Sequence, residues 1–199
     1  MNAALLLIGL LCPTAEPDLS AVLKKLQAHQ TVQATMVQLK TNKAFKQPQR
    51  SEGRFIVAPP RKLRWEYLKP FRTALVLNGD KVSMSYPDLN RKQTFDLNRD
   101  PSMKAVLETI LFFLEAKPEL VSERFSVTLA TAEADVARLT LIPKAEKARQ
   151  LLARIVVDVD TKQGVLARIQ LIEPDGDSSD IRFSDHRINE AVDEALLLP

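Results

Sequence analysis

Short runs in which apolar and polar residues alternate fill most of the chain, and they constrain its fold more than any other feature. In the run containing Leu63, Trp65 and Tyr67, every second side chain is apolar, which is the spacing of a strand that buries one face. Turn-forming pairs such as Asn78-Gly79 separate successive runs. We therefore predict about ten antiparallel strands joined by short connections.

Strands in hairpin order, each with one apolar face, predict a mainly β fold: a single curved antiparallel sheet, or incomplete β-barrel, covered by helices. The length of 199 residues suits one domain. The first five runs place on a common face Phe55 and Val57; Leu63, Trp65 and Tyr67; Leu75 and Leu77; Val82, Met84 and Tyr86; and Phe95 and Leu97. Further strands are predicted at 124–130, 136–142, 154–160, 165–173 and 179–188.

Two helices are predicted to cover the concave side of this sheet. The first begins after Asp18 as N-cap, and its apolar residues follow helical spacing. The second has Asp100 as N-cap and Pro101 at its first position, and it ends at Pro118. The apolar residues of the first are Leu19, Val22, Leu23 and Leu26, and those of the second are Met103, Val106, Leu107, Ile110, Leu111, Phe113 and Leu114.

The first eleven residues are almost entirely apolar, yet they are too few to span a bilayer as a helix. We interpret 1–15 as a signal peptide and 16–199 as the mature domain, which predicts a periplasmic protein. Cys12 is the only cysteine, so one chain forms neither a disulfide nor a cysteine-based zinc site. A lipoprotein signal is the alternative, although Leu11 stands where a small residue is expected before a lipidated cysteine.

The chain shows little that suggests enzyme chemistry. Hydrophobic residues make up 45% and charged residues 27%, which is ordinary globular usage and argues against a disordered, collagen-like or polytopic membrane protein. The only histidines are His29 and His186. Asp185 precedes His186, but neighbours on a strand point to opposite faces, so we expect a surface histidine and no catalytic pair. Five glycines do not build a phosphate loop. We expect no catalytic residues, no cofactor and no metal.

Charge is unevenly distributed along the chain, although the net formal charge is only +3. Segment 40–72 is strongly basic and segment 173–194 strongly acidic. The basic segment could meet anionic lipid or an acidic protein, or simply be solvated. Nucleic acid is disfavoured as a partner because the aromatic residues lie on the apolar faces. Asp175, Asp177 and Asp180 are only partly similar to a calcium loop, and we predict a solvated turn.

A curved sheet with an apolar concave face is compatible with either a ligand cavity or an ordinary packed core. Strands with one apolar face usually just bury it, so periodicity alone favours the core. The periodicity of a strand does not show whether its apolar face lines a ligand cavity or belongs to a packed core.

Five segments in order resemble one known family. They are SEGRFIV at 51–57, LVLNGD at 75–80, MSYPDLN at 84–90, LTLIPK at 139–144 and IRFSDHRIN at 181–189. Together they resemble the outer-membrane lipoprotein carrier family, LolA, over 17–199. The resemblance implies an incomplete β-barrel closed by a helical lid, with an apolar cavity that shelters lipoprotein acyl chains in the periplasm, and neither catalytic residues nor a cofactor.

The resemblance also implies partners. A monomer would receive a lipoprotein or other acylated amphiphile from an inner-membrane lipoprotein-releasing transporter and deliver it to an outer-membrane acceptor. Two alternatives remain open: a carrier of another amphiphile, such as a glycolipid or pigment ester, and a non-transporting envelope sensor or assembly module with the same fold.

The resemblance favours the cavity over the packed core. Pro59 stands where family members commonly place an arginine that bonds to the lid, so Arg61 is the candidate latch. The candidate ligand-binding residues of the apolar cavity are Phe55, Leu63, Trp65, Tyr67, Leu75, Leu77, Met84, Tyr86, Phe95, Ile110, Leu111, Phe113 and Leu114.

Overall fold

The structure is a computed structural model that describes residues 18–45, 47–99 and 118–199. The predicted signal peptide at 1–15 and the predicted second helix at 100–117 lie outside the described residues.

Eleven strands form one sheet, in the order β6-β5-β4-β3-β2-β1-β11-β10-β9-β8-β7, and neighbouring strands are antiparallel. The order ends at β6 and β7, so the described sheet is not closed into a barrel. The strands are β1 (Val32–Thr41), β2 (Gln49–Ala58), β3 (Lys62–Lys69), β4 (Thr73–Asn78), β5 (Lys81–Tyr86), β6 (Arg91–Asp96), β7 (Phe125–Glu133), β8 (Val136–Pro143), β9 (Arg154–Asp160), β10 (Val165–Ile172) and β11 (Ser178–Ile188). The predicted fold class, a curved antiparallel sheet covered by helices, is confirmed.

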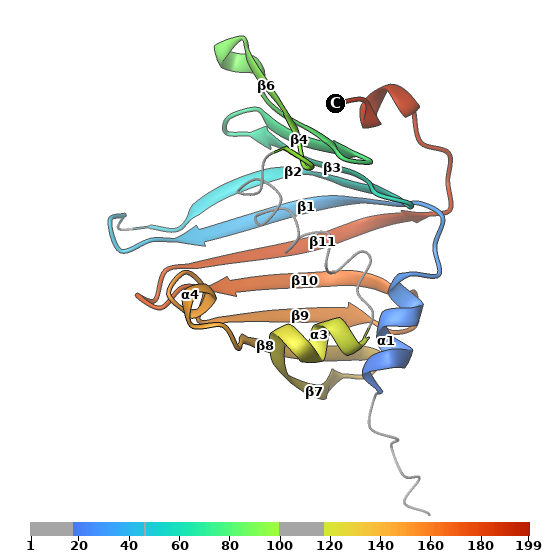
Figure 1. The fold of residues 1–199 in the computed structure, drawn as a ribbon, viewed down its shortest axis with the longest axis vertical. Coiled ribbons are helices and arrows are strands. Elements are labelled where there is room, and N and C mark those ends of the chain that lie inside the picture. The colour runs from blue at the N-terminus through green and yellow to red at the C-terminus, as the bar shows by residue number, and fades with distance from the viewer. Residues whose placement is uncertain (1–17, 46, 100–117) are drawn as a thin grey trace, which may run out of the picture.

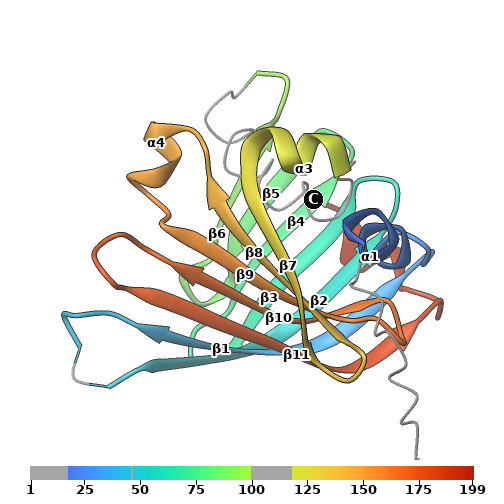
Figure 2. The same ribbon diagram turned by 90° about the horizontal axis from the view of Figure 1, so that it is seen from below.

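The sheet bends into a trough, and α1 and α3 lie on its concave side (Figures 1 and 2). The helices are α1 (Leu19–Leu26), α3 (Pro118–Arg124) and α4 (Glu146–Arg149), with 3-10 turns η1 (Pro87–Leu89) and η2 (Glu194–Leu197). Asp18 caps α1 as predicted, since its carboxylate accepts from the backbone N–H of Ala21 at 3.1 Å. Val22 and Leu23 of α1 and Val121 of α3 enter the same core as the concave face of the sheet. None of the described helices is long and apolar enough to cross a bilayer.

Two sequence-based expectations about the elements were incomplete or wrong. Strand β1 was not predicted, because its inward residues Ala34 and Met36 are weaker hydrophobes than its outward Val37 and Leu39. Pro118 begins α3, whereas we expected it to end a helix. Proline suits the first turn of a helix because the N–H it lacks has no partner there.

The convex face is also covered over part of the sheet, although the strands were predicted to have one apolar face each. Ile56 and Ala58 point away from the concave core and pack with Leu197 of η2 in a second cluster. Arg64 donates to the carbonyl oxygen of Leu196 at 3.0 Å, and Asn78 donates to that of Leu197 at 3.0 Å. The C-terminal segment therefore covers β2, β3 and β4 from outside.

Over the other half of the convex face, ion pairs join neighbouring strands. Arg138 of β8 donates to Asp158 of β9 at 2.6 and 2.8 Å. Arg168 of β10 donates to Asp180 of β11 at 3.0 and 2.6 Å and lies 3.8 Å from Asp158. The Arg168 guanidinium lowers the pKa of the Asp180 carboxyl, so this carboxylate stays charged to lower pH than an isolated one.

Candidate functional site

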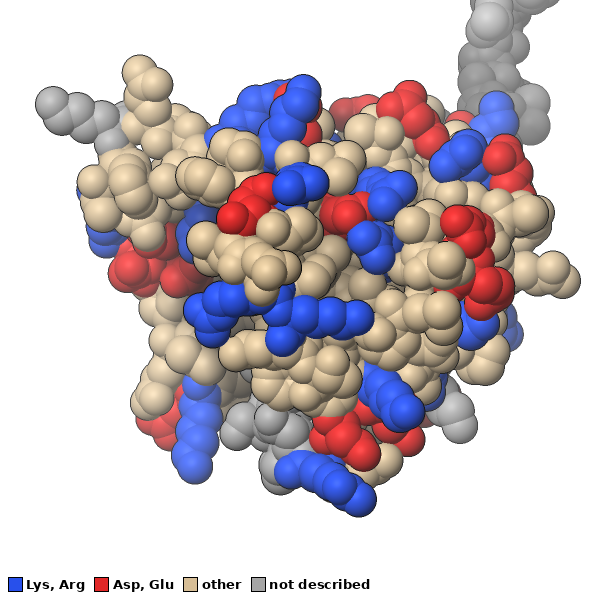
Figure 3. All heavy atoms as spheres, turned by 90° about the horizontal axis from the view of Figure 1, so that it is seen from above, with Lys and Arg blue, Asp and Glu red and all other residues tan. Residues whose placement is uncertain are grey.

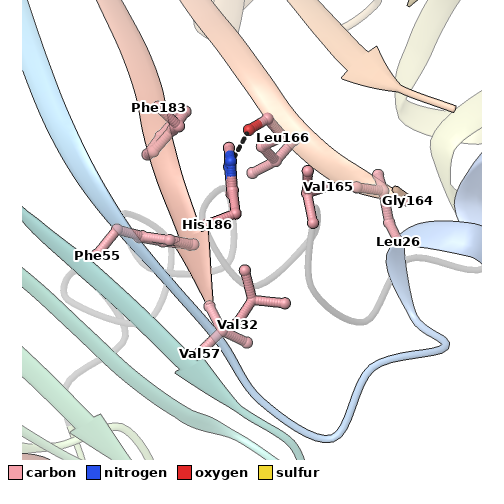
Figure 4. Close-up of a pocket in the computed structure, with 9 residues that line it drawn as sticks. All are labelled: Leu26, Val32, Phe55, Val57, Gly164, Val165, Leu166, Phe183 and His186. Carbon is pink, nitrogen blue, oxygen red and sulfur yellow. Dashed lines mark hydrogen bonds between the residues drawn. The ribbon is translucent and has the colours of Figure 1, made fainter. Parts of the chain in front are cut away.

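An apolar cavity of about 40 Å³ lies on the concave side, where α1 meets the sheet (Figure 4). Its wall comes from α1, β1, β2, β10 and β11, which are far apart in the sequence and adjacent in the trough. The lining residues are Leu26, Val32, Phe55, Val57, Gly164, Val165, Leu166, Phe183 and His186.

Three aromatic rings form one side of this site. Phe55 of β2 and Phe183 of β11 have ring centroids 5.2 Å apart, and both line the cavity. Trp65 of β3 packs edge-on against both, at 5.5 Å from Phe55 and 6.0 Å from Phe183. Edge-to-face pairs at these distances are favourable. The cluster joins strands on both sides of β1 and fixes the shape of the apolar wall.

Among the described residues that line the cavity, His186 has the only polar side chain. Between the pairs Thr35–Ser184 and Gln33–Arg187, two residues of β11 lie opposite one residue of β1, which is a β-bulge. The bulge breaks the alternation of side chains along β11 and aims the imidazole at the cavity. His186 Nε2 donates to the carbonyl oxygen of Leu166 at 2.9 Å (Figure 4).

The expectation of a surface histidine was therefore wrong for His186, which is half-buried. The error follows from the bulge at Asp185, whose φ of 53° interrupts the strand. Both histidines have structural roles, since His29 Nε2 lies 2.8 Å from the carbonyl oxygen of Gln163.

The β9–β10 turn holds α1 against the mouth of the cavity. Lys25 Nζ donates to the carbonyl oxygen of Thr161 at 2.7 Å, beside the bond of His29. Gly164 has a φ of 70°, and a Cβ there would lie 2.8 Å from the carbonyl oxygen of Lys25. A glycine is therefore required both for the turn and for the close approach of α1.

The predicted cavity residues that the structure describes lie on the concave face, and of these only Phe55 lines the cavity itself. Leu63 and Leu77 are fully buried in the concave core. Partly buried residues packed against that core are Trp65, Tyr67, Leu75 and Phe95, while Met84 and Tyr86 are half-buried on β5. Ile110, Leu111, Phe113 and Leu114 lie outside the described residues. Ligand contact by these residues stays a prediction.

Away from α1, the concave face becomes polar. The Tyr67 hydroxyl donates to Gln38 Oε1, and Gln38 Nε2 donates to the Ser179 hydroxyl at 3.1 Å. Burial raises the pKa of Tyr67, so its hydroxyl stays protonated as a donor. Tyr67 was predicted as an apolar cavity residue, yet its hydroxyl group belongs to this polar row across β3, β1 and β11.

Arg61, the candidate latch, lies in the turn before β3. Its φ of 52° interrupts the extended backbone, so Arg61 does not follow the alternation that would place its side chain on the same face as Leu63 and Trp65. Its guanidinium bonds to the β4–β5 turn, with Nε 3.3 Å from the carbonyl oxygen of Gly79 and Nη2 3.3 Å from Asp80 Oδ1. A role in closing a lid stays a prediction.

Sequence reasoning missed most of the cavity wall. Phe183 was detectable, because Ile181 and Phe183 alternate within the predicted strand at 179–188. Val32 was missed together with β1. His186 had no sequence signal, since a bulge decides its direction.

Acidic residues gather at the β10–β11 turn. Glu173, Asp175 and Asp177 place carboxylate oxygens within 4.8 Å of one another, whereas Asp180 pairs with Arg168. The predicted solvated turn is only partly correct. Asp177 is buried and accepts from the backbone N–H of Lys43 at 3.0 Å, so it ties this turn to the β1–β2 hairpin.

Comparison with solved structures identifies the same fold in other proteins. An uncharacterized conserved protein from Thermus thermophilus matches with a TM-score of 0.58 at 13% identity, covering 88% of this chain and 90% of that one. A chain of the Pseudomonas aeruginosa MucA/MucB complex structure matches with a TM-score of 0.54 at 14% identity, covering 90% of this chain and 58% of that one.

Sequence comparison identifies the family. An outer-membrane lipoprotein carrier protein of Methylococcus capsulatus is 27% identical over 197 residues, covering 96% of this chain and 90% of the relative. Another, from Xanthomonas oryzae pv. oryzae, is 29% identical over 143 residues, which is 71% of this chain and 64% of the relative's length. The family model described as outer membrane lipoprotein carrier protein LolA matches residues 27–197. The chain therefore belongs to the LolA family.

Proposed function

We propose that this protein carries the acyl chains of a lipoprotein, or of a similarly acylated amphiphile, on the concave face of its sheet. The observation that carries the proposal is the unclosed sheet whose concave face carries a large apolar core cluster, with a cavity where α1 meets it. Membership of a family whose curated relatives are named lipoprotein carriers supports it.

The size of the cavity indicates how cargo would enter. A volume of about 40 Å³ holds only a few groups of the size of a water molecule. A long acyl chain therefore requires the walls to separate. Among the described wall residues, Leu26, Val32 and His186 are half-buried and the others are buried. Each methylene moved from water to apolar surface contributes about 0.8 kcal/mol, so affinity should rise with chain length.

The role also requires a location. In this proposal, residues 1–15 direct export and are removed, and the mature protein takes cargo from an inner-membrane lipoprotein-releasing transporter to an outer-membrane acceptor. N-terminal sequencing of the protein from a native periplasmic fraction should begin near residues 15–17. An intact amino terminus recovered from cytosol would refute the location.

The decisive experiment on cargo is mass spectrometry of the protein purified from its native envelope. We expect bound acylated molecules, with lipoprotein as the main class. If only glycolipid or pigment ester is recovered, the cargo is another amphiphile and not lipoprotein. Recovery of a protein partner with no acylated molecule would refute the carrier role.

A pair of variants on α1 tests whether the cavity is the binding site. Leu26→Glu places a carboxylate in the cavity wall, which is costly against an apolar ligand. We expect at least a tenfold loss of affinity, as an order of magnitude, for a long-chain fatty acid or an apolar dye. Ala21→Glu adds the same charge on the exposed side of α1 and should bind as wild type. Equal affinities of the two variants would place the binding site elsewhere.

A further inference from the structure

The two ends of the trough differ, and the end away from α1 is the distal end. Because successive strands are antiparallel, it carries the β1–β2, β3–β4, β5–β6 and β10–β11 turns and the segment that joins β8 to β9. These connections lie toward the left in Figure 1, while α1 lies at the right.

Exposed large apolar side chains gather at the distal end. The most exposed are Leu151 in the β8–β9 segment at 77% and Phe71 in the β3–β4 turn at 76%, followed by Leu89 in the β5–β6 turn at 66%. Among the described residues, nine large apolar side chains are exposed, and seven of them lie in distal connections or within three residues of a distal strand end. The seven are Leu39, Phe45, Leu68, Phe71, Leu89, Ile142 and Leu151. The distal end therefore exposes more large apolar side chains than the rest of the described surface.

An ion pair holds two of the apolar tips side by side. The backbone N–H of Arg72 donates to Asp88 Oδ2 at 2.9 Å, and its Nε donates to Asp88 Oδ1 at 2.7 Å. Phe71 precedes Arg72, and Leu89 follows Asp88. The Arg72–Asp88 pair, which we call the clamp, therefore fixes the positions of Phe71 and Leu89, the two apolar tips, on neighbouring turns. These bonds lower the pKa of the Asp88 carboxyl, which keeps the clamp charged at neutral pH.

Basic residues surround these tips. Near the β3–β4 and β5–β6 turns, the exposed bases are Lys69, Arg72, Arg91 and Lys92. Arg72 and Asp88 neutralise each other, and Lys69 lies 3.5 Å from Glu52. In the space-filling view from the β6 side, lysine and arginine side chains are interspersed with uncharged and acidic ones and do not form one continuous patch (Figure 3). The exposed bases of the distal end are Lys40, Lys43, Arg50, Lys69, Arg72, Arg91, Lys92, Lys144, Lys147, Arg149 and Arg154. They outnumber the carboxylates of the same end, which are Glu52, Asp88, Glu146, Glu173, Asp175 and Asp177.

We propose that the distal end docks on an anionic membrane surface, with Phe71 and Leu89 entering the interfacial layer and the surrounding bases meeting lipid phosphates. Apolar tips on separate turns, flanked by lysine and arginine, match the chemistry of that interface. A protein partner is less suited, because protein interfaces pack a contiguous core, and these side chains stand on separate projections. The proposal goes beyond cargo binding, which uses the concave face.

Vesicle flotation tests this proposal. The full protein should float with vesicles of phosphatidylglycerol and phosphatidylethanolamine at low salt, and bind pure phosphatidylcholine vesicles at least fivefold more weakly, as an order of magnitude. Raising the salt concentration should weaken binding, because charges at the surface are screened. Failure to float with anionic vesicles at low salt would overturn the proposal and leave a protein partner as the explanation of this surface.

Substitution of the tips identifies the contact. The double variant Phe71→Ser with Leu89→Ser should lose roughly tenfold in affinity for anionic vesicles, because two exposed side chains no longer insert. Leu198→Ser is the matched control: it removes a side chain that is 62% exposed on the C-terminal segment, and it should bind as wild type. Equal binding by the double variant and the control would refute insertion by the tips.

The clamp provides a test that separates geometry from charge. Asp88→Ala removes a negative charge, so electrostatics alone predicts tighter binding to anionic vesicles. If the clamp holds the tips for insertion, binding should weaken instead. A second probe, Phe71→Trp, should show quenching of the introduced indole by brominated lipid, whereas Leu198→Trp should not. Quenching at residue 198 alone would overturn the orientation.

Discussion

The C-terminal cover of the convex face can be tested by one substitution, Leu197→Ala. Leu197 has no exposed surface and packs with Ile56 and Ala58 in the convex cluster. Truncation removes buried carbons and leaves a cavity, which costs about 2–5 kcal/mol for leucine at buried sites. We expect the lower part of that range, about 2–3 kcal/mol, because a short covering segment can relax onto the sheet.

Urea denaturation followed by circular dichroism measures the effect. The midpoint should fall while the slope with urea stays unchanged, since the surface exposed on unfolding is almost the same. In a thermal scan, a domain of this size loses about 2–4 °C per kcal/mol, which gives a decrease of about 4–12 °C.

Leu198→Ala is the control, because the neighbouring side chain is 62% exposed. It should stay within about 0.5 kcal/mol of wild type. Equal midpoints for the two variants would refute the packing of η2 on β2, β3 and β4. A loss far above about 5 kcal/mol would also contradict the reasoning, because a peripheral segment can detach before the whole sheet unfolds.

Three further predictions concern other parts of the fold. Gly53→Ala should destabilise by at least about 1–3 kcal/mol in urea, because a Cβ would overlap the carbonyl oxygen of Glu66; unchanged stability would contradict the packing of β2 on β3. Bonds from Arg168 hold the pKa of Asp180 below its ordinary value of 3.8. This carboxylate therefore stabilises the fold fully above that pH, and the contribution is lost as the pH falls from there through the lower pKa of the folded state. Asp180→Asn should therefore flatten the acid decrease in unfolding free energy below about pH 4, and an unchanged pH profile would exclude the pair as its source. If Arg61 is a latch, Arg61→Leu should speed dye entry into the empty cavity and slow cargo release, because no polar latch then competes with the cargo; unchanged rates would remove that role.

The sheet was predictable where a strand buries a single face. For β9, the predicted range 154–160 is the range observed. Ile155, Val157 and Val159 share one buried face, while three of the four alternate positions are charged, the exception being Val156. The same method failed at β1, where Val37 and Leu39 point outward. Because apolar residues lie on both faces of β1, the sequence shows no alternation of apolar and polar residues. The pairing of β1 with β2 and β11 decides which face is buried.

The cavity was less predictable than the sheet, because it depends on contacts between distant segments. Phe55 was placed correctly by parity along β2. The direction of the His186 side chain depends on a bulge in β11. The bulge shifts the alternation of side chains by one residue and has no distinct sequence signal. Gly164 was recognised only as a turn residue, and the close approach of α1 that requires a glycine there was visible only in the structure.

Strand β2 lies between the cavity and the C-terminal segment that covers the convex face, and the sequence of β2 indicates this position. Residues 55–58 are consecutively apolar and buried, which is typical of a strand covered on both faces. Phe55 and Val57 point toward the cavity, while Ile56 and Ala58 point toward Leu197. The C-terminal cover therefore fixes the outer side of the same strand whose inner side forms the cavity wall. Since β2 is held from outside, opening the cavity by moving α1, which contributes only Leu26 to the wall, disturbs fewer contacts than moving β2.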